Sequence, residues 1–461
     1  MRSNTAALRD IANVIHPYTN LAVHEESGPM IIERGKGIMV YDDQGKEYIE
    51  GLAGLWCTSF GFGEEELIEA AVEQMRKLPS YHAFAHKTTG VLIDLAEKLK
   101  EIAPAAFSKV FFVCSGSEAN DSQLKLLWYY NNARGRPEKK KVISRIKGYH
   151  GVTIAAASLT GLPANHRDFD LPIPQVKHAA TPHYYREAEA GETEEEFSTR
   201  LAAQLEQQIL EEGPDTVAAF IAEPVMGAGG VIVPPAGYFP KIQAVLDKYD
   251  IRMISDEVIC GFGRTGNMWG AETFDMKPHS LSCAKALSSA YLPIGAVMID
   301  EDMYQAMVDE SKKIGTFGHG FTYGGHPVPA AVALRTLQLM EERDLLGHTR
   351  NVMGRFQKRL NSFADHPLVG ETRGVGMIGA VELVADKASK AAFEPTAGVG
   401  AYCSSRSLEY GLIHRALGDA IGFCPPLIIT ESEIDEMFDR FAKALDDTEA
   451  WVAKEGHRAA A

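Results

Sequence analysis

The chain has 461 residues, a formal net charge of −16, 45% hydrophobic residues and 23% charged residues. This length allows more than one domain, and the composition is that of an ordinary globular protein. The negative charge argues against nucleic acid and anionic membranes as partners. No stretch reaches the roughly 18 apolar residues of a membrane span.

The cysteines and the N-terminal residues bear on the cellular location of the protein. Six cysteines are spread along the chain without a C-x-x-C pair, which is typical of free thiols in a reducing environment. Residues 1–20 lack the apolar core of a signal peptide. A cytoplasmic location is therefore expected.

The N-terminal part predicts a short helix followed by a strand hairpin. Pro17 ends the helix, because proline cannot continue one. The expected strands are Met30–Glu33, Gly37–Tyr41 and Glu47–Glu50. From about residue 64 to residue 327, helical and strand patterns alternate, which predicts a mostly parallel sheet with helices on both faces.

Two helices can be predicted with their boundaries. Thr193 and Glu196 form a capping-box pattern, and the helix that follows ends at Gly213-Pro214. The last helix starts at Thr430, and its expected buried face consists of Ile434, Met437, Phe438, Phe441 and Leu445.

The character of the chain changes near residue 329. Val328–Leu346 is interpreted as one long helix and Gly374–Val384 as one strand. We expect an α/β protein in three parts. Residues 1–60 form an N-terminal segment that joins the small domain, residues 61–328 a large domain, and residues 329–461 a smaller α+β domain.

Lys285 is the only Lys, Arg, Asp or Glu between Pro278 and Ile299. Lysines are rarely buried without a functional reason. Burial in general favours the neutral amine, which is the form that makes a Schiff base. The simpler interpretation is a lysine on a turn with its ammonium in water, and the residues upstream weigh against it.

Two upstream stretches supply an acid and an anion site. Ile251–Ile259 reads as a buried strand that carries Asp256 and Glu257, and a buried carboxylate needs a cationic partner such as a protonated pyridine. Phe111–Tyr130 reads as a strand, a Ser-Gly-Ser turn and a helix, whose first amides can hold a phosphate. Together with Lys285, these features point to pyridoxal 5'-phosphate.

Six motifs in the same order resemble those of class III pyridoxal-phosphate-dependent aminotransferases, closest to the amine/ω-amino acid:pyruvate transaminases. They are Ser115–Asn120, Gly148–Gly151, Ala222–Gly230, Ser255–Gly266, Lys285 and Gly318–Pro327. The resemblance implies fold type I, with a mostly parallel central sheet in the large domain and a smaller α+β domain. It also implies a homodimer or homotetramer with shared active sites.

The resemblance implies a role for each matching residue. Lys285 and Asp256 would be catalytic, and Tyr149 and Val258 would lie on opposite faces of the cofactor ring. The other cofactor-binding residues would be Ser115, Gly116, Ser117, His150, Glu223, and, from the neighbouring subunit, Phe321 and Thr322. The substrate-binding residues would be Tyr18, Leu55, Trp56, Phe84, Tyr149 and Val152, for which ordinary core packing is the alternative.

Arg415 is the remaining candidate. Relatives that act on ornithine or γ-aminobutyrate carry an arginine just before an F-x-P-P-L segment, paired with the glutamate that matches Glu223. Here that place is Gly422. Arg415 then resembles a mobile loop arginine that binds the carboxylate of a keto acid, and a surface loop arginine is the alternative.

The predicted reaction moves an amino group from an amine or ω-amino acid to pyruvate, giving alanine. A 4-aminobutyrate- or diamine-type aminotransferase, an aminomutase, a decarboxylase and a non-catalytic binding protein stay open. Gly261–Gly266 and Gly374–Gly379 match G-x-G-x-x-G and would suit a nicotinamide-dependent oxidoreductase, but neither opens a predicted helix. His82 and His86 could share a helix face but lack an acidic neighbour, so no catalytic metal is expected.

Overall fold

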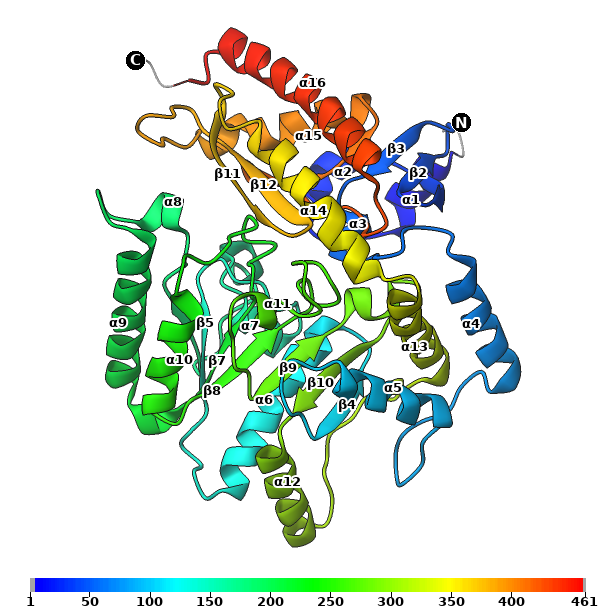
Figure 1. The fold of residues 1–461 in the computed structure, drawn as a ribbon, viewed down its shortest axis with the longest axis vertical. Helices are drawn as coiled ribbons and strands as arrows, with labels where there is room; N and C mark the ends of the chain where they lie inside the picture. Colours follow the sequence, from blue (N-terminus) through cyan, green and yellow to red (C-terminus); the bar gives the residue numbers. More distant parts are fainter. Residues whose placement is uncertain (1–4, 459–461) are drawn as a thin grey trace.

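The computed structural model describes residues 5–458, and a seven-stranded sheet lies at its centre (Figure 1). Only β10 runs against its neighbours, so six of the seven strands point the same way. The spatial order is β4 (Lys109–Val113), β10 (Gly295–Ile299), β9 (Ser280–Cys283), β8 (Arg252–Asp256), β7 (Val217–Ala222), β5 (Lys141–Arg145) and β6 (Val176–Ala179). The mostly parallel sheet expected from the sequence is confirmed.

Successive residues of the central strands pack into two separate cores. In β10, Ala296 and Met298 belong to one hydrophobic cluster, and Val297 and Ile299 to the other. The first cluster includes residues of α9 (Glu194–Glu212) and α10 (Tyr238–Lys248), and the second includes residues of α6 (Gly116–Ala133) and α12 (Glu301–Ile314). Helices therefore cover both faces, as alternating side chains on a parallel sheet require.

Two smaller sheets lie above the central one in Figure 1, where the two ends of the chain come together. One has the order β1 (Ile32–Lys36), β2 (Met39–Asp42), β3 (Glu47–Glu50), β13 (Leu412–Ile413). The other has the order β11 (Val369–Val375), β12 (Ile378–Leu383), β15 (Ala420–Phe423), β14 (Arg415–Leu417). The parallel pairing of β13 with β3 supports a small domain built from both ends of the chain.

The remaining elements connect or cover these sheets. The α-helices are α1 (Ala6–Asn13), α2 (Leu21–Ser27), α3 (Ala53–Trp56), α4 (Glu65–Lys77), α5 (Gly90–Glu101), α7 (Ile154–Leu159), α8 (Tyr184–Glu187), α11 (Gly270–Thr273), α13 (Pro327–Glu342), α14 (Leu345–Asn361), α15 (Val399–Glu409) and α16 (Glu431–Glu455). Short 3₁₀ helices span Pro163–Asn165, Pro214–Thr216, Lys285–Ser288 and Pro395–Ala397. Within residues 5–458, no helix combines the length and apolar character needed to cross a bilayer.

The two helices predicted with their boundaries are confirmed, and both begin with a capping box. Thr193 and Glu196 cap α9 reciprocally, and Thr430 and Glu433 do the same for α16. The capping side chains satisfy backbone amides that have no partner inside the helix. The predicted apolar face of α16 is buried in full.

Two elements predicted after residue 327 are wrong, and one N-terminal helix was not predicted. Val328–Leu346 is not one helix, because Asp344 adopts a left-handed conformation (φ 44°) and starts α14 by accepting a hydrogen bond from the Gly347 amide at 3.1 Å. Gly374–Val384 is a hairpin, since Gly376 (φ 56°) reverses the chain between β11 and β12. The helix α2 was not expected, and Asn20 caps its start.

Candidate active site

The candidate residues gather at one edge of the central sheet. Ser115 follows β4, Tyr149 follows β5, Glu223 directly follows β7, Asp256 ends β8 and Lys285 follows β9. These strands run in the same direction, so their carboxyl ends meet at one edge, where ligands of α/β proteins bind. The topology thus joins groups that are up to 170 residues apart in sequence, from 115 to 285.

Asp256 is almost fully buried and held by three donors. Its Oδ2 lies 2.7 Å from Nδ1 of His150 and accepts a hydrogen bond from Nδ2 of Asn120 at 2.7 Å. Its Oδ1 accepts a hydrogen bond from the Val258 amide at 3.1 Å. Among the described residues no lysine or arginine forms an ion pair with it, so a cationic ligand group would complete its environment.

The expected strand Ile251–Ile259 is too long. β8 ends at Asp256, and Val258 lies in a turn. The two acids of this stretch have different surroundings. Oε2 and Oε1 of Glu257 accept hydrogen bonds from the amides of Gly270 and Ala271 at 2.9 and 2.7 Å, and burial raises the pKa of Glu257 to about 7. Glu257 therefore anchors the start of α11.

Asn120 was not predicted as a site residue. It lies on α6, is 1% exposed, and its Nδ2 also donates to the carbonyl of His150 at 2.8 Å. It thereby fixes the turn after β5 against the carboxylate at the end of β8. A signal was present, because Asn120, Ser122 and Gln123 place polar side chains on a helix that is otherwise buried by leucines.

The start of α6 has the geometry expected of an anion site. Oγ of Ser115 caps the helix by accepting a hydrogen bond from the Glu118 amide at 3.1 Å. Oγ of Ser117 accepts one from the Val152 amide at 3.1 Å, which brings the turn after β5 to the same helix end. The first amides of the helix stay available for a phosphate, and the helix dipole favours a negative charge there.

Gly116 is required at this helix start by close packing. A Cβ atom on it would lie 3.0 Å from both Cγ atoms of Val258. We expect Gly116→Ala to weaken cofactor binding by about tenfold or more, since the added methyl group would displace Val258, which is expected against the cofactor ring. Gly90 is the matched control, because it also opens a helix and a Cβ atom there meets nothing within 4 Å.

Fluorescence titration of the cofactor-free protein with pyridoxal 5'-phosphate measures both variants. Equal affinities for Gly116→Ala and Gly90→Ala would contradict the packing argument.

Glu223 is buried, and both of its carboxylate oxygens accept hydrogen bonds from nearby backbone amides. Oε1 accepts a hydrogen bond from the Tyr149 amide at 2.9 Å, and Oε2 accepts one from the Gly227 amide at 3.0 Å. Burial raises the pKa of this carboxyl. Glu223 therefore positions the Tyr149 turn.

Lys285 begins a 3₁₀ helix and is half-buried. Its φ is 46°, an uncommon value for a residue with a side chain. Such backbone conformations persist where the surrounding structure enforces them, and they concentrate at functional sites.

Four of the predicted substrate residues are exposed and therefore not core residues: Tyr18, Leu55, Phe84 and Val152. Trp56 differs, because it is 2% exposed and belongs to a hydrophobic cluster. The ring centroids of Tyr18 and Tyr149 lie 6.4 Å apart in an edge-to-face arrangement. Nδ2 of Asn165, a residue not foreseen here, donates to the Tyr18 hydroxyl at 2.5 Å.

Two of the residues expected at the site, Phe84 and Phe321, border a separate cavity in the single chain. Phe84 and Phe321 line a cavity of about 1120 Å³ between α5 and the glycine-rich stretch 316–325, and neither Lys285 nor Asp256 borders it. Thr322 is exposed. In a single chain, Phe84 and Phe321 therefore share this cavity with neither Lys285 nor Asp256.

Arg415 does not lie on a loop, contrary to expectation. It starts β14, where it pairs with Gly422 of β15 across a tight hairpin. Its charge faces Tyr149, whose pKa is raised by burial while Arg415 acts in the opposite direction. Within residues 5–458, its side chain forms no hydrogen bond or ion pair with another side chain, so it can turn toward a ligand without breaking one.

The motifs behind the alternative hypotheses have other roles. Gly374–Gly379 lies in the β11–β12 hairpin, and Gly261–Gly266 forms turns that lead to the four-residue helix α11. Neither has the strand–loop–helix context of a dinucleotide site. His82 and His86 lie on an irregular segment, so the shared helix face is wrong.

A fold type I large domain with a lysine, a buried acid and a helix start at one sheet edge defines a pyridoxal-phosphate-dependent enzyme. The model of the class-III aminotransferase family matches residues 21–445, and the chain belongs to this family. Its cofactor is pyridoxal 5'-phosphate. The site fits this cofactor. Among the described residues, Asp256 has no lysine or arginine partner, and Nε2 of His150 is buried without a hydrogen-bond partner.

Solved structures and curated relatives agree with this family. A thermostable ω-transaminase variant from Pseudomonas jessenii has a TM-score of 0.96 and 56% identity, covering 97% of this chain and 99% of that one. The ω-transaminase of that organism in complex with PMP has a TM-score of 0.96 and 55% identity over 97% of this chain and 99% of that one. Tomato gamma aminobutyrate transaminase 3 is 51% identical, covering 95% of this chain and 84% of that protein.

Proposed function

We propose that this aminotransferase moves an amino group from an amine or ω-amino acid to pyruvate, giving alanine. The observation that carries the proposal is the pairing of Arg415 with Gly422 beside Trp56. A Cβ atom on Gly422 would lie 3.1 Å from Cη2 of Trp56, so an arginine there would have to displace the indole. Arg415 then supplies the cation for one carboxylate.

The charge of the pocket favours a monocarboxylate acceptor. Both oxygens of Glu223 are held by backbone amides, and glycine at position 422 supplies no arginine to pair with them. The buried guanidinium of Arg145 donates to the main-chain carbonyl of Glu223. A keto acid with a second carboxylate would place that charge among Tyr149, Trp56 and Tyr18 without a cation, which is costly in a dry site. Pyruvate has only the carboxylate that Arg415 can bind.

The chain's own groups have distinct parts in the proposed reaction. Pyridoxal phosphate supplies an electron sink that makes the C–H bond beside the amine acidic. Lys285 binds the cofactor aldehyde and carries the proton to and from the substrate carbon. Asp256, held by His150 and Asn120, keeps a proton on the pyridine nitrogen.

A 4-aminobutyrate aminotransferase is the second candidate. It is favoured by the names of curated relatives, which include gamma aminobutyrate transaminases of tomato and rice. A vanillin aminotransferase of Capsicum annuum is 50% identical over 92% of this chain and 93% of that protein, which widens the range of amines to consider.

A substrate panel tests the proposal. Purified enzyme receives pyruvate or 2-oxoglutarate with 4-aminobutyrate, β-alanine, a diamine or an aromatic amine, and the amino acid formed is measured. We expect alanine with pyruvate and at least about tenfold less product with 2-oxoglutarate. A preference for 2-oxoglutarate would refute the proposed acceptor, and activity with 4-aminobutyrate alone would favour the second candidate.

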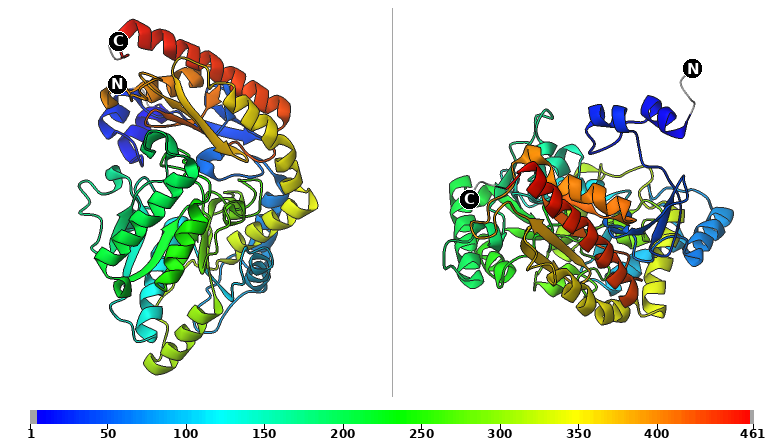
Figure 2. Two further views of the ribbon diagram at one scale, coloured as in Figure 1. Left: turned by 60° about the vertical axis from the view of Figure 1, so that its left-hand side comes forward. Right: turned by 90° about the horizontal axis from the view of Figure 1, so that it is seen from above.

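We also propose a homodimer, with stacking into a tetramer left as the alternative. The proposal is supported by Phe84 and Phe321, which line a cavity that neither Lys285 nor Asp256 borders in one chain. A second chain would bring its copies of these residues to the site. The helices α1 and α2 project from the body (Figure 2). They and the segment between them expose Leu8, Val14, Ile15, Leu21 and Val23. An apolar surface of this kind is typical of a subunit interface.

Mixed dimers of two inactive variants test the shared site. Lys285→Ala and Thr322→Ala are co-expressed with different tags and the mixed species is isolated. If Thr322 binds the phosphate of the neighbouring subunit, one of the two sites in a mixed dimer is intact, and activity recovers to about half that of the wild type. Mixed dimers without activity would show that Thr322 does not act across the interface.

We propose a cytoplasmic location on the basis of the cysteines. All six are free thiols in the structure. Some relatives carry names that place them in chloroplasts or mitochondria, so fractionation of the source cells has to test this location.

A further inference from the structure

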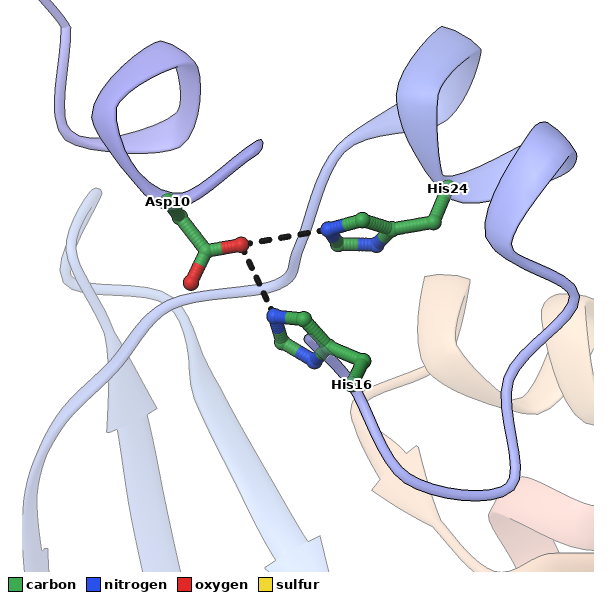
Figure 3. Close-up of side chains that lie close together, drawn as sticks. All are labelled: Asp10, His16 and His24. Carbon is green, nitrogen blue, oxygen red and sulfur yellow. Dashed lines mark hydrogen bonds and ion pairs between the residues drawn. The ribbon is translucent and has the colours of Figure 1, made fainter. Parts of the chain in front are cut away.

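A histidine–aspartate cluster lies in the N-terminal segment, apart from the sheet edge (Figure 3). Asp10 lies on α1, His16 on the loop after it and His24 on α2. Nε2 of His16 and Nε2 of His24 lie 2.8 and 3.1 Å from the same atom, Oδ2 of Asp10. Figure 3 shows both rings pointing their nitrogens at the carboxylate.

We propose that Asp10, His16 and His24 bind a divalent transition-metal ion, with Zn²⁺ as the best fit. Two imidazoles and one carboxylate form a ligand set that Zn²⁺ accepts, with water in the fourth position. Ligand distances of about 2 Å at tetrahedral angles place the ligand atoms about 3.3 Å apart. The two spacings to Asp10 Oδ2 differ from that value by only a few tenths of an ångström.

The cluster has an enclosed side and an open side. The side chain of His24 is 9% exposed, whereas those of Asp10 and His16 are 22% and 29% exposed. The open side leaves room for the water that completes the coordination. The closed side holds His24 in place before the ion arrives, which lowers the conformational cost of binding.

A second cluster, of one histidine and two glutamates, shows what distinguishes this one. His183, Glu371 and Glu382 also lie close enough to bind a metal. There, however, Arg373 Nη1 donates to both carboxylates, and Arg186 donates to Glu382 at 2.5 Å. The two guanidinium groups therefore already supply the positive charge that a metal ion would bring to these carboxylates.

Asp10 has no such partner. Among the described residues, its ion pairs are with the two histidines only, and no lysine or arginine reaches it. The counter-charge for its carboxylate therefore has to come from these imidazoles or from a bound cation, and a metal satisfies all three groups at once.

A metal here would stabilise a weakly anchored part of the fold. In the single chain, α1 has no buried residue and α2 buries only His24. The ion would join α1, the following loop and α2. Tyr18 lies two residues after His16 and reaches Asn165 through its hydroxyl, so the same link would hold Tyr18 beside Tyr149.

Metal titration of tag-free holoenzyme tests the site without measuring turnover. After chelation and dialysis, calorimetry with Zn²⁺ should find one ion per chain, and Co²⁺ should give the visible bands of a tetrahedral site. His24→Gln should weaken Zn²⁺ binding by at least about 100-fold, since even partners outside the coordination shell cost 10- to 100-fold. Asp10→Asn should weaken it too, although an amide oxygen can still accept the histidine hydrogen bonds.

His86→Gln is the matched control, because His86 is an exposed histidine on another segment, and it should leave the affinity unchanged. Limited trypsin digestion gives a second readout. Zn²⁺ should slow cleavage after Arg9, next to Asp10 on α1, in the wild type but not in His24→Gln. Absence of Zn²⁺ binding by the wild type, or a His24→Gln variant that binds Zn²⁺ as the wild type does, would overturn the proposal.

Discussion

Replacing Lys285 with alanine should abolish turnover while the cofactor still binds without a covalent bond. The phosphate site at the start of α6 and the carboxylate of Asp256 do not depend on the lysine, so they remain to hold the cofactor. The variant loses both the amine that bonds the cofactor aldehyde and the group that moves the proton. We expect kcat to fall by at least about 10⁴-fold, the upper range for a positioned acid–base group.

Lys139 provides the matched control. It is 5% exposed, and burial lowers the pKa of its amine, so by burial alone it is also a candidate for a neutral lysine. It precedes β5, however, at the opposite edge of the sheet from Asp256, and it donates to the carbonyl of Tyr249. Lys139→Ala should keep both turnover and the covalent bond.

Borohydride reduction followed by peptide mapping distinguishes the two lysines. The pyridoxyl group should be found on the peptide that contains Lys285. A pyridoxyl group on Lys139 or on any other lysine would make the assignment wrong.

Site residues that lie at the carboxyl ends of parallel strands could be predicted from the sequence. Asp256 and Lys285 each stand at the end of an apolar run, and runs of that kind form the parallel strands whose ends share one edge. The capping boxes of α9 and α16 were equally predictable, because their hydrogen bonds join residues three positions apart.

Features that depend on one backbone angle could not be predicted. The break between α13 and α14 rests on Asp344 in a left-handed conformation, and neither glycine nor proline marks it. The hairpin of β11 and β12 does contain Gly376, but an apolar run with a glycine also reads as a continuous strand. Asn120 acts across 136 residues of sequence, from α6 to β8, which no local pattern reveals.

The position of Arg415 shows a third limit. β14 has only three residues, which is too short for a period-two pattern to separate a strand from a loop. Because the backbone of Arg415 is paired with Gly422, only its side chain can move toward or away from a substrate. β14 bonds to β15 alone and lies at the edge of its sheet, so the arginine can extend toward the pocket or away from it.

Arg415→Ala should separate the two half-reactions of the enzyme. A carboxylate bound by a guanidinium gains about 1.5–3 kcal/mol from a charged hydrogen bond, so kcat/KM for pyruvate and alanine should fall about ten- to a hundredfold. An aromatic amine without a carboxylate does not use this contact. Its half-reaction should change little, because the side chain is free to turn away and leaves no buried charge unpaired.

Arg415→Lys is the control for charge. It keeps the cation but loses the two parallel hydrogen bonds of the guanidinium, so its loss for pyruvate should lie between those of the wild type and Arg415→Ala. Stopped-flow absorbance of the cofactor measures each half-reaction separately. Equal losses for pyruvate and for the aromatic amine would mean that Arg415 stabilises the β14–β15 hairpin, and that another residue binds the carboxylate.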